Sequence, residues 1–271
     1  MSSSSTYQAD FQKWTGKSMS YTTVRRRVLY ELRSYISLFP SVHLPIARKR
    51  RKGKVSRLYK PVAETWLPRA IDEETEIVLE GFERSGNTFA LTAFAMAQDR
   101  PVVVAHHLHS ASQIVEGVRR GLPVVLLIRN PDDAVLSVKI HSPAYSLAGI
   151  FRVYNRLYRN VEAYRDKIVV ADFKAVTGNF GAVIRAVNEK FGTDFKEFDH
   201  SKDNVDTCFK LIEERWRHSD GEVRELGVGR PSQDRKQLKA ELLPQLEAPE
   251  LAKLRQEAFA LYNRLVGDSD G

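Results

Sequence analysis

Short apolar runs alternate with longer stretches of helix-forming residues through the middle of this 271-residue chain. The runs of strand length lie at residues 77–79, 101–105, 124–128 and 168–171. Stretches of helical character lie at residues 88–98, 110–120, 131–140, 150–165 and 180–191. Strands that alternate with helices form a parallel sheet covered on both faces. The pattern therefore predicts a three-layer α/β/α fold with a central, mostly parallel sheet.

The regular pattern begins near residue 75, which divides the chain into two parts. We expect residues 1–74 to be a basic N-terminal extension that is partly mobile. Residues 75–271 are expected to form one α/β domain with a helical C-terminal part, which is interrupted at Gly227-Val228-Gly229. Within the extension, residues 25–39 have the mixed apolar and basic character of an amphipathic helix. Residues 48–54 carry six cations, which predicts a solvated surface or a docking patch for a membrane or an acidic substrate.

The charge balance favours anionic partners. The formal net charge of +8 suits a nucleotide, an acidic glycan, a nucleic acid or an anionic membrane, and the alternative is that it serves solubility alone. A single cysteine, Cys208, excludes an internal disulfide and favours a reducing compartment. The first 14 residues lack the apolar core of a signal peptide, and no apolar run approaches the ~20 residues of a membrane span. We expect a cytoplasmic protein, with membrane contact through its basic N-terminal segment.

A loop with the features of a phosphate site follows the first strand. It reads Glu80-Gly81-Phe82-Glu83-Arg84-Ser85-Gly86-Asn87-Thr88 and leads into a helix. The spacing of its glycines is that of a nucleotide-triphosphate loop, which indicates a fold of P-loop nucleotide-binding type. However, Asn87 stands where such a loop has lysine, and the cation is Arg84 instead. We expect the loop to bind a phosphate other than the γ-phosphate of ATP, through Arg84, Ser85, Gly86, Asn87 and Thr88.

Two further candidate sites follow later strands, whose carboxyl ends meet at one edge of a parallel sheet. The first contains His106, His107 and His109. No cysteine or acid lies at ligand spacing nearby, so a general base is favoured over a metal site, with local packing as the alternative. In the second, Asn130 and Pro131 suit a helix start, which leaves Arg129 and Ser137 to hold a second phosphate.

Together these motifs resemble those of the sulfotransferase family that uses 3′-phosphoadenosine 5′-phosphosulfate (PAPS). The segment 83–88 is similar to the family's 5′-phosphosulfate loop. The segment 129–133 with Ser137 is similar to its 3′-phosphate motif, and His107 aligns with its catalytic histidine. The motifs occur in the family's order, with Arg129 43 positions after Gly86. Residues 171–174 are similar to a further family segment, and the resemblance covers about residues 76–195.

The chain departs from the family pattern at three places. Glu83 replaces a proline, and Ala105 stands where many members have lysine. The family's C-terminal Arg-Lys-Gly segment has only a loose counterpart here, in which Arg230 or Arg235 would meet the 3′-phosphate.

The resemblance implies transfer of a sulfuryl group from PAPS to a hydroxyl or amine acceptor, on a glycan or another acidic or small molecule. The product nucleotide would be adenosine 3′,5′-bisphosphate (PAP). In this scheme His107 is the base, Arg84 stabilises developing charge, and Thr88 holds the 5′-phosphate. Arg129 and Ser137, with Arg230, bind the 3′-phosphate, and no metal or nucleic acid is expected. The alternatives are a P-loop small-molecule kinase, and a non-enzymatic basic protein that binds membrane or nucleic acid on a vestigial nucleotide fold.

Overall fold

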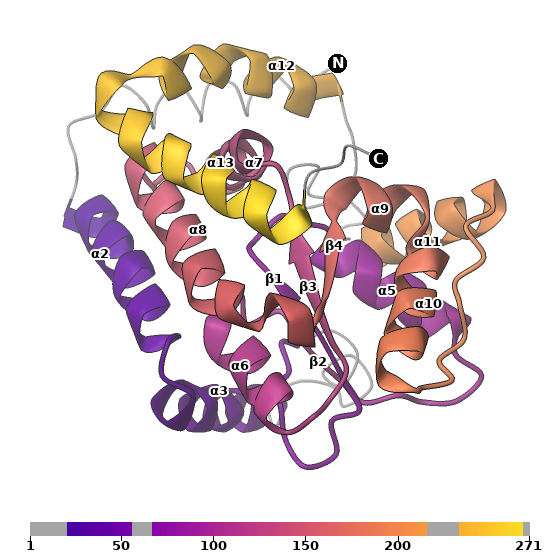
Figure 1. Ribbon diagram of the computed structural model, residues 1–271. Helices are drawn as coiled ribbons and strands as arrows, with labels where there is room; N and C mark the ends of the chain where they lie inside the picture. Colours follow the sequence, from indigo (N-terminus) through magenta and orange to yellow (C-terminus); the bar gives the residue numbers. More distant parts are fainter. Residues whose placement is uncertain (1–20, 56–66, 216–232, 268–271) are drawn as a thin grey trace.

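The computed structural model describes residues 21–55, 67–215 and 233–267 (Figure 1). Within these ranges the sheet has four parallel strands in the order β2-β1-β3-β4. The strands are β1 (Ile77–Gly81), β2 (Val104–His106), β3 (Val124–Ile128) and β4 (Val169–Asp172). Because all four run in the same direction, the segments that follow them emerge at the same edge of the sheet.

Helices cover both faces of the sheet (Figure 1). One face packs against α5 (Asn87–Ala97), α9 (Phe173–Gly178), α10 (Phe180–Phe191) and α11 (Lys202–Arg215). The other packs against α2 (Tyr21–Ile36), α3 (Pro40–Val55), α6 (Ala111–Arg119), α7 (Pro131–His141), α8 (Leu147–Val161), α12 (Gln233–Leu242) and α13 (Ala252–Val266). Short 3-10 helices are η1 (Glu162–Lys167), η2 (Leu243–Glu247) and η3 (Pro249–Leu251). This is the predicted three-layer α/β/α fold.

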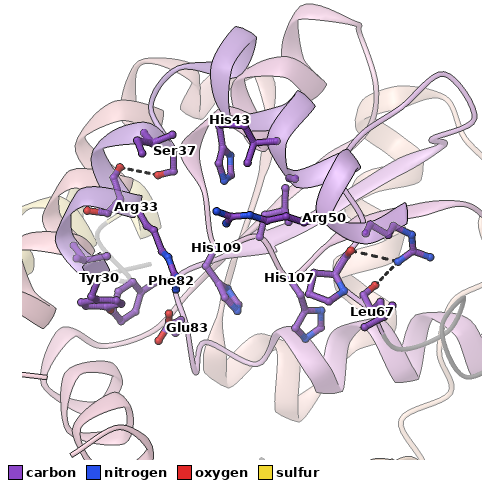
Figure 2. A pocket seen from close by; sticks show the side chains of 18 of the residues that line it. Tyr30, Arg33, Ser37, His43, Arg50, Leu67, Phe82, Glu83, His107 and His109 are labelled. Carbon is purple, nitrogen blue, oxygen red and sulfur yellow. Dashed lines mark hydrogen bonds between the residues drawn. The ribbon is translucent and has the colours of Figure 1, made fainter. Parts of the chain in front are cut away.

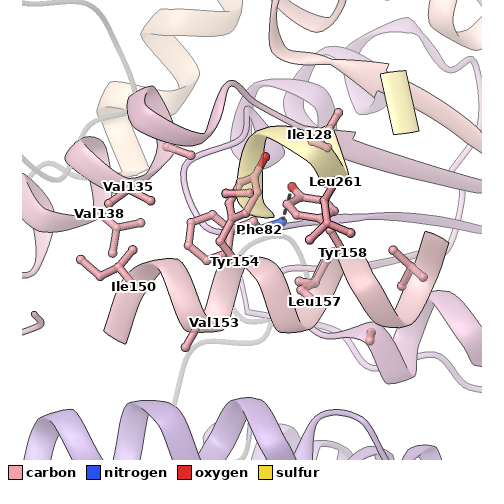
Figure 3. Close-up of a cluster of buried hydrophobic side chains, with 14 of the residues drawn as sticks. Phe82, Ile128, Val135, Val138, Ile150, Val153, Tyr154, Leu157, Tyr158 and Leu261 are labelled. Carbon is pink, nitrogen blue, oxygen red and sulfur yellow. Dashed lines mark hydrogen bonds between the residues drawn. The ribbon is translucent and has the colours of Figure 1, made fainter. Parts of the chain in front are cut away.

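Successive side chains of a strand point to opposite faces of the sheet, so there is one hydrophobic core on each face. In β3, Leu126 and Ile128 face the α8 side, whereas Val125 and Leu127 face the α5 side. Figure 3 shows the first core, in which α8 packs beneath the strands. Its buried Tyr158 donates a hydrogen bond to the Leu127 carbonyl (2.9 Å) and accepts one from the backbone N–H of Phe82 (3.3 Å). The core tyrosine therefore positions the backbone at the point where the loop after β1 begins.

Some elements begin or end at other residues than expected. The strand expected at 101–105 begins only at Val104, because the Val103 N–H is bound by the Glu76 carboxylate (3.0 Å) and Pro101 has no N–H. The helix expected at 150–165 begins earlier as α8, after Ser146 caps it by accepting from the Gly149 N–H, and ends in η1.

The N-terminal helices pack on the α/β domain. Tyr30 of α2 and Leu44 of α3 are buried in the first core. The break expected at 227–229, and Arg230, lie outside the described residues. In the part of the chain that is described, no helix combines the length and the apolarity needed to cross a bilayer.

Gly81 ends β1 in close contact with β3, which yields a stability prediction. A Cβ at this position would lie 2.0 Å from the Leu127 carbonyl oxygen. We expect Gly81→Ala to lower the free energy of unfolding by about 3 kcal/mol or more, since backbone atoms must move apart. Urea denaturation measures this. Gly178→Ala is the matched control, because a Cβ there has nothing within 4 Å; equal stability of the two variants would contradict the prediction.

Candidate functional site

The loop after β1 reverses the chain with unusual backbone angles. Arg84 has a φ of 65° and Gly86, the N-cap of α5, has a φ of 90°. The Asn87 side chain is buried, and its amide donates to the Phe82 carbonyl (2.9 Å), which holds the loop closed. Because its side-chain amide is used within the loop, the group that Asn87 can offer a ligand is its backbone N–H. The N–H groups in the first turn of α5 have no intrahelical acceptor, which suits an anion at this end.

Residues of the two predicted phosphate motifs meet in space. Arg84 Nε donates to Ser137 Oγ of α7 (3.3 Å), and Arg129 Nη1 donates to the Arg84 carbonyl (3.1 Å). The Arg129 guanidinium lies over the ring of Phe173, 4.0 Å from its centroid. Its buried Nε has no hydrogen-bond partner among the described residues. The loop after β1 and the loop after β3 thus form one site at the carboxyl edge of the sheet.

This site concentrates positive charge in an arginine cluster, Arg84, Arg129 and Arg235. Burial, followed by the charges of Arg235 and Arg129, lowers the pKa of Arg84 to about 9, against the opposing effect of Glu83. Burial likewise lowers the pKa of Arg129, although Asp133 and Asp172 counteract it. Three partly buried cations held close together repel one another, so a bound anion with several charges would relieve an existing electrostatic cost.

The acids of the second motif serve the C-terminal helices. Asp132, at the start of α7, forms an ion pair with Arg255 of α13 (2.8 Å). Its neighbour Asp133 pairs with Lys239 of α12. The first pair holds α13 beside α7, and the second holds α12, the helix that carries Arg235. This long-range function of the two aspartates was not expected from the sequence, which indicated only that they suit a helix N-terminus.

His106 ends β2, and the other two histidines lie on a tight loop, residues 107–109, that is tied to the sheet by Glu80. His107 and His109 have φ angles of 58° and 51°. The Glu80 carboxylate is fully buried and accepts four hydrogen bonds, from the N–H groups of Gly81 (3.1 Å), Leu108 (2.9 Å) and His109 (3.0 Å) and from Gln113 Nε2 (2.9 Å). Burial raises the pKa of Glu80, and the nearby His109 and the backbone donors counteract that rise. The sequence pattern predicts no function for Glu80 beyond its place in the loop; the available signal is an acid directly after three apolar strand residues.

Hydrogen bonding distinguishes the histidines. His109 Nδ1 lies 2.8 Å from the Gly81 carbonyl, which can only accept, so Nδ1 carries a hydrogen and, in the neutral form of the ring, the lone pair is on Nε2. His107 Nε2 lies 3.2 Å from Thr88 Oγ1, and its Nδ1 lies 2.8 Å from Nδ1 of the buried His106. His107 is therefore adjacent to the expected 5′-phosphate site. Among the described residues, no three His, Cys, Asp or Glu side chains are grouped as a metal site would require.

A cavity of about 500 Å³ lies against the histidine loop. Figure 2 shows side chains from α2 and α3 on one side of it and those of Glu83, His107 and His109 on the other. The lining also includes the aromatic residues Tyr30, Phe82 and Tyr145 and the basic residues Arg33, Arg50 and Arg51. Burial raises the pKa of Glu83, while the charges of His109 and Arg84 oppose that rise. The size and mixed lining suit a small or medium-sized ligand.

The Glu80 network yields a second stability prediction. In Glu80→Gln one carboxylate oxygen becomes an NH₂ group that faces two N–H donors, so two buried hydrogen bonds are lost. We expect a loss of about 2–4 kcal/mol in the free energy of unfolding, measured by urea denaturation. The control is Glu76→Gln, where the partly exposed side chain pairs with Arg100, and the loss should stay below about 1 kcal/mol. Equal losses in the two variants would show that the hydrogen bonds of Glu80 do not tie the histidine loop to the sheet as proposed.

Comparisons with known proteins add a distant likeness in structure. No family model and no curated protein matches the sequence. A solved structure, mouse sulfotransferase SULT7A1 complexed with PAP, superposes with a TM-score of 0.41 and 11% sequence identity. The match covers 74% of this chain and 88% of that one. At this level the likeness assigns neither a family nor a ligand.

Proposed function

We propose that this protein is a PAPS-dependent sulfotransferase that modifies a hydroxyl or amine of an acceptor bound in the cavity. One observation carries the proposal: the two sequence motifs, 43 residues apart, meet through the contacts of Arg84 with Ser137 and with Arg129. A ligand with phosphate groups at two positions would engage both motifs at once. PAPS is such a ligand, and it supplies the sulfuryl group.

The residues fit a bisphosphate donor. The first turn of α5, Thr88 and Arg84 would hold the 5′ end, where negative charge develops on the bridging oxygen as the sulfur–oxygen bond breaks. Arg129 would bind the 3′-phosphate with its buried Nε–H, which has no partner in the described part of the chain. Ser137 and Arg235 stand beside it, and Arg230 remains a proposed further contact. Asn87 closes the loop in place of a phosphate-binding lysine, which disfavours the kinase alternative.

The acceptor would approach from the cavity. In the transfer its hydroxyl or amine attacks sulfur, PAP leaves, and a base takes the acceptor proton. We propose His107 as this base, because its ring touches Thr88 on the donor side and also lines the cavity. His109 is the second candidate, since its Nδ1–H is held by Gly81 and its Nε2 keeps a lone pair. Glu83 stands on the acceptor side of the loop, where it would contact a donor group of the acceptor.

Nucleotide affinity tests the donor. By isothermal titration calorimetry, we expect PAP to bind at least tenfold more tightly than ADP. Arg129→Gln should weaken PAP binding by about 10–100-fold, the effect of one or two charge-assisted hydrogen bonds, and should change 5′-AMP binding much less. Arg119→Gln removes the same charge from an exposed site on α6 and should leave PAP affinity unchanged. Equal affinities for PAP and ADP would refute the proposed donor.

Transfer with sulfur-35-labelled PAPS and a panel of glycan, phenol and amine acceptors tests the base. His107→Asn should lower the rate about 100-fold or more, because proton removal is lost, and should keep the PAP affinity. His109→Gln should lower the rate less than tenfold. The reverse order would assign the base to His109, and full activity of both variants would exclude this loop from proton transfer.

A further inference from the structure

Large hydrophobic side chains gather on the solvent side of the two N-terminal helices. In the described part of the chain, eight large hydrophobic residues are exposed, and seven of them lie on α2, α3 or the turn between them. They form what we call the apolar stripe: Val24, Val28, Leu32, Tyr35, Phe39, Val42 and Ile46, each 40–59% exposed. Ile46, at the end of the stripe, also lines the cavity. The eighth is Leu243. Hydrophobic exposure concentrated on one surface indicates an interaction site, whereas scattered single residues would not.

The stripe is not the side by which α2 packs on the domain. That side is formed by Tyr30, which is buried and stacks on Tyr145 with ring centroids 4.0 Å apart. Glu31 adds a two-pronged ion pair with Arg152 of α8 (2.7 and 2.8 Å). Within the stripe, Val24, Val28, Leu32 and Tyr35 recur every three or four residues, which places them along one line of the helix. The helix is thus anchored on one side, and Val24, Val28 and Leu32 are exposed away from these anchors. Tyr35 lies at the border, where the Arg156 guanidinium of α8 covers one face of its ring, 3.5 Å from the centroid.

The same segment carries the charge of the protein. Residues 21–55 contain ten Lys and Arg and one acid, Glu31, for a net charge of +9 against +8 for the whole chain. All other residues together are therefore close to neutral. The exposed cations flank the stripe, and they are Arg25, Arg26, Arg33, Lys49, Arg50 and Lys52. A second copy of this face would bring +9 against +9, so self-association through it is electrostatically unfavourable.

We propose that α2 and α3 dock this protein on the surface of an anionic phospholipid bilayer. The apolar stripe would enter the boundary between headgroups and acyl chains, and the flanking cations would meet the lipid phosphates. A bilayer offers both complements, apolar depth and negative surface charge, whereas a soluble polyanion offers only the second. Figure 1 shows α2 and α3 together at the periphery of the molecule, away from α5 and α10.

Docking in this way would also bring the cavity close to the bilayer. Arg33 of α2 and Arg50 and Arg51 of α3 line the cavity, so the helices that would contact lipid form its wall. This consequence rests on the proposed function, whereas the docking itself does not. PAP affinity, which tests the function, and vesicle binding, which tests the docking, can therefore fail separately.

Co-sedimentation of the full chain with large unilamellar vesicles tests the proposal. We expect at least tenfold tighter binding to phosphatidylglycerol–phosphatidylcholine vesicles than to phosphatidylcholine alone. Leu32→Glu should weaken binding to the anionic vesicles at least tenfold, whereas Leu243→Glu should change it less than twofold. The two leucines are each 49% exposed, so the two variants differ in the position of the new charge and not in the side chain or its exposure. Lys49→Gln with Lys52→Gln should weaken binding more than Lys190→Gln with Lys210→Gln, which removes two exposed charges elsewhere.

Three results would overturn the proposal. Equal binding of the Leu32 and Leu243 variants, with heparin competing fully, would make this face a polyanion site without insertion. A dimer in sedimentation velocity that Leu32→Glu dissociates would identify a second copy as the occupant. Unchanged vesicle binding together with a lower unfolding free energy of Leu32→Glu would show that another part of this chain covers the stripe. Circular dichroism of each variant confirms that it is folded.

Discussion

The Glu80 carboxylate joins the two loops on which the candidate site is built. It lies at the end of β1, directly before the loop that carries Arg84, and it accepts the N–H groups of Leu108 and His109. Without an acceptor, these buried donors would each cost about 1–3 kcal/mol, so the histidine loop has no comparable alternative position. Because the same residue also belongs to β1, the distance between the arginine cluster and the histidines is set by the central sheet.

Residues with strained backbone angles lie at the site, and hydrogen bonds from neighbouring groups hold them there. Three non-glycine residues with positive φ are found in the described part of the chain, Arg84, His107 and His109, and all three lie at the site. Such backbone angles persist only where the surroundings hold them. Here Tyr158 binds the backbone at Phe82, the Asn87 amide closes the loop, and Glu80 fixes the histidines. Preorganisation of this kind suits a site that must present charge without rearranging.

The local sequence pattern predicted the sheet and the edge at which the site lies. It could not predict the contacts between side chains that are far apart in the sequence. The alternation of apolar and helical segments was sufficient for the sheet, and the positions of Arg84 and Arg129 at strand ends were sufficient to place them at one edge. That Ser137 contacts Arg84, and that Asp132 and Asp133 anchor α13 and α12, depends on side chains from distant segments and could not be read from spacing. The outward direction of the apolar stripe depends likewise on how Tyr30 packs in the core, since periodicity defines a face and not its partner.

The presence of an acid at position 83 can be explained by the charges on its two sides, the arginine cluster and the cavity. The arginine cluster is strongly positive, and the cavity wall also contains Arg33, Arg50 and Arg51. Without an acid beside them, the arginines of the cavity wall would also attract a polyanion. Glu83 stands between them, and its charge opposes the lowering of the Arg84 pKa. In the proposed enzyme, this carboxylate would keep the donor phosphates on the cluster side and leave the cavity to an acceptor that can donate a hydrogen bond.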